Sequence, residues 1–142
     1  MKVALGADHG GFEYKNKISD MLQNEGYDVT DFGTYSQESC DYPIFAKKVA
    51  EAVSGGLYDR GILICGTGIG MSIAANKFKG IRAALCSDTF SAKATREHND
   101  SNILCMGARV ISFEKAEEIT RIWLETPFSQ EERHIRRIGM IE

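Results

Sequence analysis

The segment that most constrains this chain is an apolar run followed directly by three closely spaced glycines. The run, Ile-Leu-Ile-Cys at residues 62–65, is typical of a short strand that is covered on both faces. The chain then turns and resumes a helical pattern through Gly66, Gly68 and Gly70. A strand, a glycine turn and a helix start bring backbone N–H groups and a helix dipole beside the thiol of Cys65. This segment is therefore expected to hold an anion, or to stabilise one that Cys65 creates.

Strand-like and helix-like patterns alternate along the whole chain. Apolar runs typical of strands lie at residues 3–5, 27–32, 62–65, 81–86 and 103–106. Helical spacing fills the intervals, and candidate capping residues stand at Asp41, Asp88, Ser112 and Ser129. In the helix after the glycine turn, the buried side is expected to consist of Ile69, Ile73 and Ala74. The alternation predicts one α/β domain over residues 1–142, a three-layer Rossmann-like fold with a five-stranded parallel sheet and helices on both faces.

In a parallel sheet of this kind, ligands bind beyond the carboxyl ends of the strands. Chemically distinctive side chains follow four of the predicted strands, at Asp8-His9, Cys65 to Thr67, Ser87-Asp88 and Arg109. One edge of the sheet is therefore expected to collect the chemistry of the protein.

Composition argues against several other classes of function. The 142 residues carry a net charge of −3, so we expect no binding to nucleic acid or to an anionic membrane. No apolar run approaches the length of a membrane span. The cysteines are Cys40, Cys65, Cys86 and Cys105, and three of them lie in or next to apolar runs. Nothing at the N-terminus has the pattern of a signal peptide, so reduced thiols and a cytoplasmic location are the expectation.

Cys65 allows more than one interpretation. A cysteine in a strand is usually a small inert hydrophobic residue, and this suits Cys86 and Cys105. Cys65 differs because the glycine turn follows at once, and the start of a helix favours the thiolate form of a cysteine. A thiolate there could attack a carbonyl or remove a proton from carbon, and position alone does not decide between them. Thiol redox chemistry or acyl transfer is a further alternative.

Neither nucleotides nor metals are favoured by the remaining motifs. The dinucleotide fingerprint would require glycine at Met71, and the P-loop lysine is missing. A non-enzymatic nucleotide-binding module is still a second class of function, because Asp88 follows the fourth predicted strand. His9 lies in a glycine turn, His98 ends a helix, and His134 is expected on the surface. No pair of histidines has zinc-ligand spacing, so no metal site is expected.

The last predicted helix has one basic side. Arg133 and Arg137 are four residues apart and share a helix face, with Arg136 beside them. Near the edge of the sheet, their guanidinium groups would suit a phosphate. Another side of this helix must pack against something, because it carries Ile135, Ile138 and Ile141.

Six motifs occur in the order of a known family: Gly6–His9, Asp41–Pro43, Gly61–Gly70, Ala74–Lys77, Gly80–Ala83 and His98–Asp100. Over essentially its whole length the chain closely resembles type B ribose-5-phosphate isomerase, whose family also contains the galactose-6-phosphate isomerase subunits. Only the C-terminal helix matches less closely. The resemblance implies an enzyme of the pentose phosphate pathway that interconverts ribose 5-phosphate and ribulose 5-phosphate through a cis-enediolate, without a metal or an organic cofactor.

The resemblance also implies a role for each matched residue. Cys65 matches the base that moves the proton between C1 and C2, and Thr67 matches a hydroxyl that shuttles protons. His98, with Asp8 nearby, matches the group that opens the furanose ring. The anion hole for the enediolate oxygen matches the amides around Gly66, Gly68 and Gly70. The sugar contacts match Tyr42 and Asn99, and the phosphate clamp matches His9, Arg109, Arg133 and Arg137.

In the resembling family the enzymes are homodimers or homotetramers, and each active site is completed across the dimer. The C-terminal helix is accordingly expected to dock on a neighbouring subunit. The residues His98-Asn99-Asp100 favour the ribose-type enzyme over the galactose-type subunits. A 6-phosphohexose such as allose 6-phosphate or galactose 6-phosphate stays an alternative substrate, and Arg136 is an alternative to Arg137 in the clamp.

Overall fold

The computed structural model describes residues 1–142. Its strands are β1 (Lys2–Ala7), β2 (Asp28–Asp31), β3 (Arg60–Cys65), β4 (Ala83–Leu85) and β5 (Ile103–Gly107). Its helices are α1 (Phe12–Asn24), α2 (Tyr42–Ser54), α3 (Ile69–Ala75), α4 (Thr89–Asn99), α5 (Phe113–Glu125) and α6 (Glu132–Ile141). All neighbouring strands pair in parallel, in the order β2-β1-β3-β5-β4. The predicted five-stranded parallel α/β fold is confirmed.

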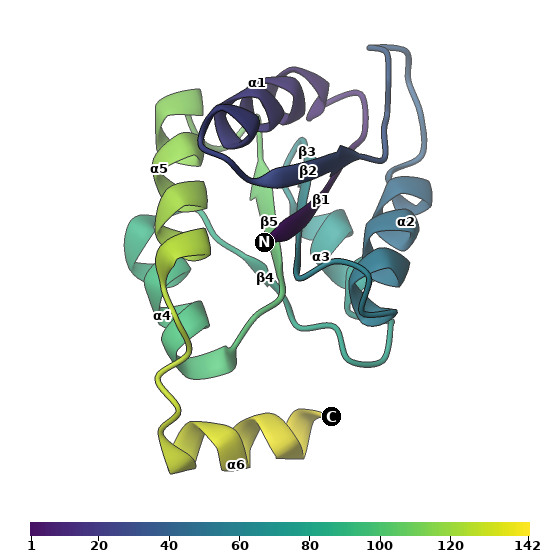
Figure 1. Ribbon diagram of the computed structural model, residues 1–142. Coiled ribbons are helices and arrows are strands. Elements are labelled where there is room, and N and C mark those ends of the chain that lie inside the picture. Colours follow the sequence, from purple (N-terminus) through teal and green to yellow (C-terminus); the bar gives the residue numbers. More distant parts are fainter.

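Helices cover both faces of the sheet, with α1, α4 and α5 on one face and α2 and α3 on the other (Figure 1). Successive side chains of β3 point to opposite faces, so Ile62 and Ile64 join the first core while Leu63 joins the second. Trp123 of α5 is fully buried in the first core. Each apolar side chain buried in this way contributes about 1.5–3 kcal/mol to folding.

The strand order changes direction between β1 and β3. The chain goes from β1 to β2 on one side, and then crosses to β3 on the other side of β1. A crevice at the carboxyl ends of two such strands is where α/β sheets bind ligands. The register pairs Ala7 with Ile64, so Asp8 and Cys65 leave the sheet side by side at this point.

The buried side of α3 differs from the one predicted. Ile69 and Ile73 are 51% and 60% exposed, whereas Met71 and Ala75 are fully buried. The start of the helix is fixed by Gly68, whose Cα lies so close to Met106 of β5 that an added Cβ would come within 2.8 Å of its backbone carbon. Two apolar stripes fit the spacing of this short helix, one through Ile69 and Ile73 and one through Met71 and Ala75. The close approach to β5 buries the second stripe. An apolar face of α3 is thus left exposed.

The predicted capping positions are confirmed at three helices and wrong at the fourth. Asp88 Oδ1 accepts a hydrogen bond from Ser91 N at 2.7 Å, and Ser112 Oγ accepts one from Lys115 N at 3.1 Å. Asp41 stands at the N-cap position of α2, but its side chain makes no capping hydrogen bond. Ser129 does not cap α6, because its hydroxyl donates to the carbonyl of Glu97 at 2.7 Å instead.

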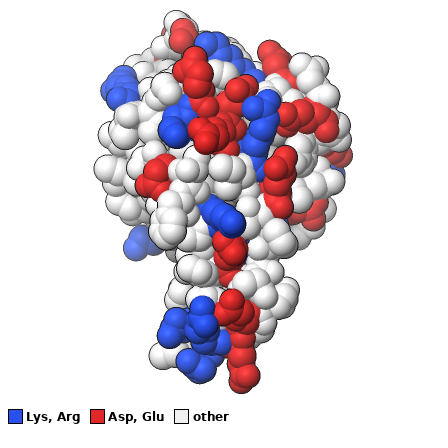
Figure 2. All heavy atoms as spheres, turned by 90° about the vertical axis from the view of Figure 1, so that its left-hand side faces the viewer, with Lys and Arg blue, Asp and Glu red and all other residues white.

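Helix α6 stands outside both helical layers, beyond the end of the sheet at which β5 begins (Figure 1). It packs against the rest of the protein mainly through α4. In the side view of Figure 2, α6 forms a projection on which Lys and Arg spheres lie beside acidic ones. Arg133, Arg136 and Arg137 are all exposed on this helix. Among the helices of the fold, none combines the length and the apolar character needed to cross a membrane.

Candidate active site

Cys65 ends β3 directly below the glycine loop, and its side chain is nearly buried, at 5% exposed. The backbone N–H of Gly68 donates to Cys65 Sγ at 3.1 Å. Because Gly68 is also the N-cap residue of α3, the sulfur lies at the positive end of that helix. Hydrogen bonds to an ionised acceptor are about twice as strong as those to a neutral one. The loop therefore aims a backbone donor at this sulfur.

The glycine loop has no room for side chains where it meets β5. Gly68 has a φ of 79°, and an added Cβ would lie 2.5 Å from Leu85 Cδ1. An added Cβ at Gly107 would lie 2.6 Å from the backbone carbonyl carbon of Thr67. The hydroxyl of Thr67 is exposed and accepts a hydrogen bond from Ile69 N at 3.2 Å. The loop thus presents backbone amides and one hydroxyl in a fixed arrangement.

A second loop, at the end of β1, packs against the first. The buried carboxylate of Asp8 accepts hydrogen bonds from Gly10 N at 2.9 Å and Gly11 N at 3.2 Å. An added Cβ at Gly10 would lie 3.2 Å from Gly66 N, and one at Gly11 would lie 2.3 Å from the carbonyl oxygen of Ile64. Asp8 therefore shapes its own loop and brings it into contact with the loop above Cys65.

His9 and Arg109 face a pocket of about 360 Å³ between the loop after β1, the start of α1 and the end of β5. Cys40 N donates to His9 Nδ1 at 3.2 Å, so Nδ1 is the acceptor and Nε2 carries the ring proton. The guanidinium of Arg109 lies over Gly66, with Nη1 3.3 Å from the position of an added Cβ. An N–H donor and a guanidinium at one pocket are suited to an anion such as phosphate.

Tyr42, at the start of α2, closes the other end of the glycine loop. An added Cβ at Gly70 would lie 2.6 Å from two carbons of the Tyr42 ring. The tyrosine is 39% exposed, so part of it is free to contact a ligand above the loop.

The remaining predicted site residues lie at the opposite edge of the sheet. His98 and Asn99 end α4, just before β5 begins, and Arg133 and Arg137 belong to α6 beyond that edge. Along β3, Gly61 pairs with Ile103 and Cys65 pairs with Gly107, so four residues, or about 13 Å of strand, separate the two edges.

Within one chain, therefore, these four residues do not meet Cys65. The expectation that one edge collects the chemistry is correct for Asp8, His9, Cys65 and Arg109, and wrong for the residues of α4 and α6. His98 has no Asp8 nearby in its own chain.

Asp88 and two of the cysteines have structural roles. The carboxylate of Asp88 caps α4, and the hydrogen bond from Ser91 lowers its pKa. Burial raises the pKa of Cys86 to about 11, and burial raises the pKa of Cys105 as well. All four cysteines are free. These two thiols are therefore neutral core residues, as predicted for them.

His134 is buried, at 6% exposed, so the prediction of a surface residue is wrong. Its ring stacks on that of His98, with the centroids 4.4 Å apart and the planes inclined by 19°. The spacing of charged residues around His134 gave no sign of this contact, because its partner lies on another helix.

Three side chains of the anion pocket were missed in the sequence. Gln37 Nε2 donates to Glu13 Oε1 at 2.8 Å, and Tyr14 OH donates to the carbonyl of Ile111 at 2.7 Å. Tyr14 follows the helical spacing of apolar residues in α1, and Gln37 lies in a polar loop without a motif. The glycine run at positions 10 and 11 was the only signal that this end of α1 approaches the site.

The family model described as Ribose/Galactose Isomerase matches residues 3–141. The chain belongs to the ribose/galactose isomerase family. It is 50% identical over 140 residues to ribose-5-phosphate isomerase B of Escherichia coli, covering 99% of this chain and 93% of that protein. It is 46% identical over 129 residues to D-erythrulose-4-phosphate isomerase of Pectobacterium atrosepticum, covering 90% and 85%.

The solved structures extend the likeness to the whole fold of this ribose/galactose isomerase family member. Ribose-5-phosphate isomerase B of Clostridium thermocellum superposes with a TM-score of 0.97 at 53% identity, covering 99% of this chain and 95% of that one. The type B ribose 5-phosphate isomerase of Trypanosoma brucei gives 0.95 at 46%, covering 99% and 95%. The glycine loop, the anion pocket and α6 all fall within the shared fold.

Proposed function

We propose that this chain is an aldose–ketose isomerase that interconverts ribose 5-phosphate and ribulose 5-phosphate in the cytoplasm. The observation that carries the proposal is the placement of Cys65 Sγ, 3.1 Å from the amide of Gly68, beside Gly66, against which both Arg109 and the loop of His9 pack. A thiol, a backbone amide cradle and an anion pocket are the three parts that proton transfer on a phosphorylated sugar requires. Membership of the ribose/galactose isomerase family supports the same reaction.

In the proposed mechanism, the thiolate of Cys65 removes the proton from C2 of the ring-opened aldose. The C–H electron pair forms a C1–C2 double bond, and the carbonyl electrons move onto O1 to give a cis-enediolate. The hydroxyl of Thr67 transfers a proton from O2 to O1, and the thiol then returns its proton to C1. The amides from Gly66 to Gly70 stabilise the enediolate, and each preorganised donor contributes roughly 3–4 kcal/mol in comparable sites.

The substrate must also be opened and held. We assign ring opening to His98 and the hydroxyl contacts to Asn99 and Tyr42. The phosphate is assigned to His9 and Arg109 together with Arg133 and Arg137. Binding the phosphate away from the reacting carbons fixes those carbons against Cys65, which turns affinity into orientation.

A second copy of the chain completes the site in this proposal. His98 and the arginines of α6 lie at the opposite edge of the sheet from Cys65, so one chain supplies each half to a different site. The exposed apolar residues support a docking role, since Ile135 and Ile141 of α6 are 49% and 67% exposed. Ile73 of α3 offers a further apolar surface near the glycine loop. A homodimer or a homotetramer satisfies this requirement.

Two alternatives concern the ligand. A tetrose or hexose phosphate is the nearer one, because the family is described by ribose and galactose and one relative is named for a tetrose phosphate. The nucleotide-binding module is the more distant alternative: the glycine turn still supports it, whereas the Asp88 carboxylate caps α4.

The direct test is an isomerase assay of purified protein in the presence of a chelator, with ribose 5-phosphate as substrate. Formation of ribulose 5-phosphate is expected, and its absence would reject the proposal. Turnover of tetrose 4-phosphate, pentose 5-phosphate and hexose 6-phosphate under the same conditions ranks the substrates. A preference for the hexose or the tetrose would reassign the substrate and keep the reaction type.

Mixing two variants, each impaired at one edge of the sheet, tests whether one site is built from two chains. Cys65→Ala removes the base from one edge of the sheet, and His98→Phe alters the other edge. Random pairing of equal amounts gives heterodimers with one intact site, so about a quarter of the wild-type activity should return. If unfolding and refolding the mixture restores no activity, each site is built from a single chain.

A further inference from the structure

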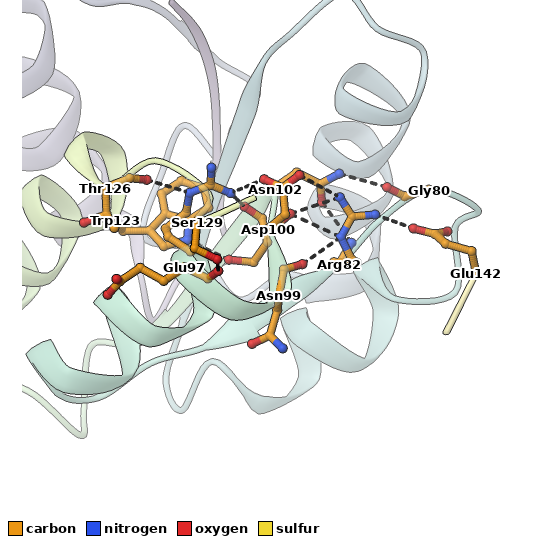
Figure 3. Close-up of polar contacts among 12 residues, drawn as sticks. Gly80, Arg82, Glu97, Asn99, Asp100, Asn102, Trp123, Thr126, Ser129 and Glu142 are labelled. Carbon is orange, nitrogen blue, oxygen red and sulfur yellow. Dashed lines mark hydrogen bonds and ion pairs between the residues drawn. The ribbon is translucent and has the colours of Figure 1, made fainter. Parts of the chain in front are cut away.

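Three contacts join α6 to one short segment of the chain, residues 97–100 at the end of α4. The first contact precedes the helix. Ser129 Oγ donates to the carbonyl of Glu97 at 2.7 Å, and Ser129 N donates to the same oxygen at 3.3 Å. This double contact fixes the point at which the chain turns toward α6, as the close-up in Figure 3 shows.

The second contact is the ring stack of His134 on His98. His134 is the only buried residue of α6. Its Nε2 has no hydrogen-bond partner, and Glu131 Oε2 lies 3.9 Å away. Burial, together with the nearby His98 and Arg133, lowers the pKa of His134, so the stacked ring is neutral near pH 7. The His134 imidazole therefore holds α6 against α4 through the face of its ring rather than through its nitrogen atoms.

The third contact is made by Arg82 at the other end of α6. Arg82 Nε donates to the carbonyls of Asn99 at 3.0 Å and Asp100 at 3.2 Å, and Nη2 donates to Asp100 at 3.0 Å. Its Nη1 forms an ion pair with the carboxylate of Glu142. In Figure 3 this guanidinium lies between the end of α4 and the last residue of the chain, while the Asn99 amide points away from it.

Two of the three contacts are made to backbone carbonyls of residues 97–100, and one is made to the side chain of His98. Arg82 holds the carbonyl groups of residues 99 and 100, where Asp100 adopts a left-handed conformation with a φ of 46°. The side chain of Asn99 makes no hydrogen bond within its own chain and stays available. Arg133 and Arg137 are exposed on α6, and Arg133 Nη2 pairs with Glu131 Oε2 at 2.9 Å.

We propose that His134 and Arg82 are positioning residues, which lock α6 onto the end of α4 so that His98, Asn99, Arg133 and Arg137 are delivered to the substrate as one rigid unit. This inference rests on the proposed function, which assigns those four residues to ring opening, sugar contact and phosphate binding. Neither positioning residue touches the substrate. Loosening either contact is expected to disturb phosphate binding and ring opening together, because both groups of residues share one support.

The experiment compares His134→Ala with His134→Phe in the full-length enzyme. Phenylalanine keeps a ring that can stack on His98 and loses both nitrogens. We expect His134→Ala to raise KM for ribose 5-phosphate and to lower kcat by about tenfold, since small displacements of positioned groups have effects of this order. His134→Phe should remain within about twofold of wild type, and so should the control Glu132→Gln on the same helix.

Two kinetic results would overturn the inference. A loss in His134→Phe equal to that in His134→Ala would make the nitrogens essential and the residue catalytic. A lower kcat with unchanged KM in His134→Ala would indicate only a smaller folded fraction. If His134→Ala does not fold, Glu142→Gln tests the Arg82 contact at the end of the chain. A KM increase of about twofold to threefold is expected there, and an unchanged KM would count against the proposal.

Hydrogen exchange separates this inference from the proposed function. Amides of residues 97–100 should exchange faster in His134→Ala than in wild type or His134→Phe, whether or not the protein isomerises any sugar phosphate. Unchanged exchange in His134→Ala would overturn the coupling while leaving an active isomerase in place. A wild type that turns over no sugar phosphate, with the faster exchange present, would reject the function and retain the coupling.

Discussion

The two edges of the sheet carry the two differently built halves of the proposed site. At the carboxyl edge, backbone amides and glycines surround Cys65, and the strands on either side hold them through a continuous parallel ladder. At the amino edge, the residues assigned to substrate binding are side chains on the end of α4 and on α6, which are held together by a few contacts. A main-chain cradle is rigid at no entropic cost to side chains, whereas guanidinium groups on an exposed helix must be ordered when they bind.

The difference separates two tasks. Stabilising charge as it develops requires donors that do not reorganise, and the carboxyl edge supplies them. In the proposed function, phosphate binding and ring opening fall to the amino edge, whose charged side chains on α6 are exposed. Variants at the two edges should therefore have separate effects on the reaction.

The largest effect is expected at the thiol. Cys65→Ala removes the proposed base and should lower kcat for ribose 5-phosphate by about a thousandfold, within the range of general-base catalysis. The measurement is the coupled isomerase assay. Cys86→Ala is the matched control, because that thiol is buried in the other core and should leave kcat unchanged in the folded enzyme. Activity retained in Cys65→Ala would remove the carboxyl edge from the chemistry.

Gly68→Ala tests the cradle. The added methyl group would lie 2.5 Å from Leu85 Cδ1 at a φ of 79°, so the amide that faces Cys65 must shift. A kcat about a hundredfold lower is expected, as for the loss of one preorganised donor. Gly139→Ala, with nothing within 4 Å of its added methyl group, is the control. Wild-type kcat in Gly68→Ala would show that the loop amides do not stabilise the intermediate.

His98→Phe separates the amino edge from the carboxyl edge by substrate. The variant keeps a ring for His134 to stack on and removes the group assigned to ring opening. Turnover of ribose 5-phosphate should fall by about tenfold to a hundredfold. Turnover of a tetrose 4-phosphate should change little, because that sugar has no free hydroxyl at C4 with which to close a furanose ring. Equal losses on both sugars would contradict a ring-opening role.

The smallest effect is a pH dependence of stability from His134. Its pKa is lowered in the folded protein from 6.5, mainly by burial, with His98, Arg133 and Arg137 adding and Glu131 opposing. Below pH 6.5 the unfolded chain takes up a proton that the folded chain resists, so stability falls as the pH falls. Urea unfolding at about pH 7.5 and about pH 5.5 should show a larger loss in wild type than in His134→Phe. Equal losses would mean that His134 titrates normally.

The carboxyl edge was largely predictable from sequence, because its signals are local. The run from Ile62 to Cys65 and the glycines after it determine a strand, a turn and a helix within a few residues. The buried side of α3 was not predictable, because an apolar stripe through Ile69 and another through Met71 both fit a helix of this length. Contact between Gly68 and β5, far away in the sequence, decides between them.

The amino edge was predictable in its residue types and not in its placement. Arg133 and Arg137 share a helix face as expected, but nothing in their spacing places α6 beyond the sheet. The Ser129 motif has the spacing of a capping box, and its hydroxyl bonds to Glu97 instead. His134 lies among charged residues, so its burial against His98 depends on tertiary structure alone. Long-range contacts of this kind leave no periodic signal.

The glycine loop has a consequence for anyone who wishes to alter which sugar the protein accepts. A surface made of main-chain atoms has no side chains to exchange, and Gly68 and Gly107 leave no space in which to add one. In the proposed site, new selectivity must therefore come from replacements on α6 and at the end of α4, whose side chains are exposed in the single chain. The same backbone cradle would then act on sugars of different length, because the reaction stays the same and only the residues that contact the far end of the sugar change.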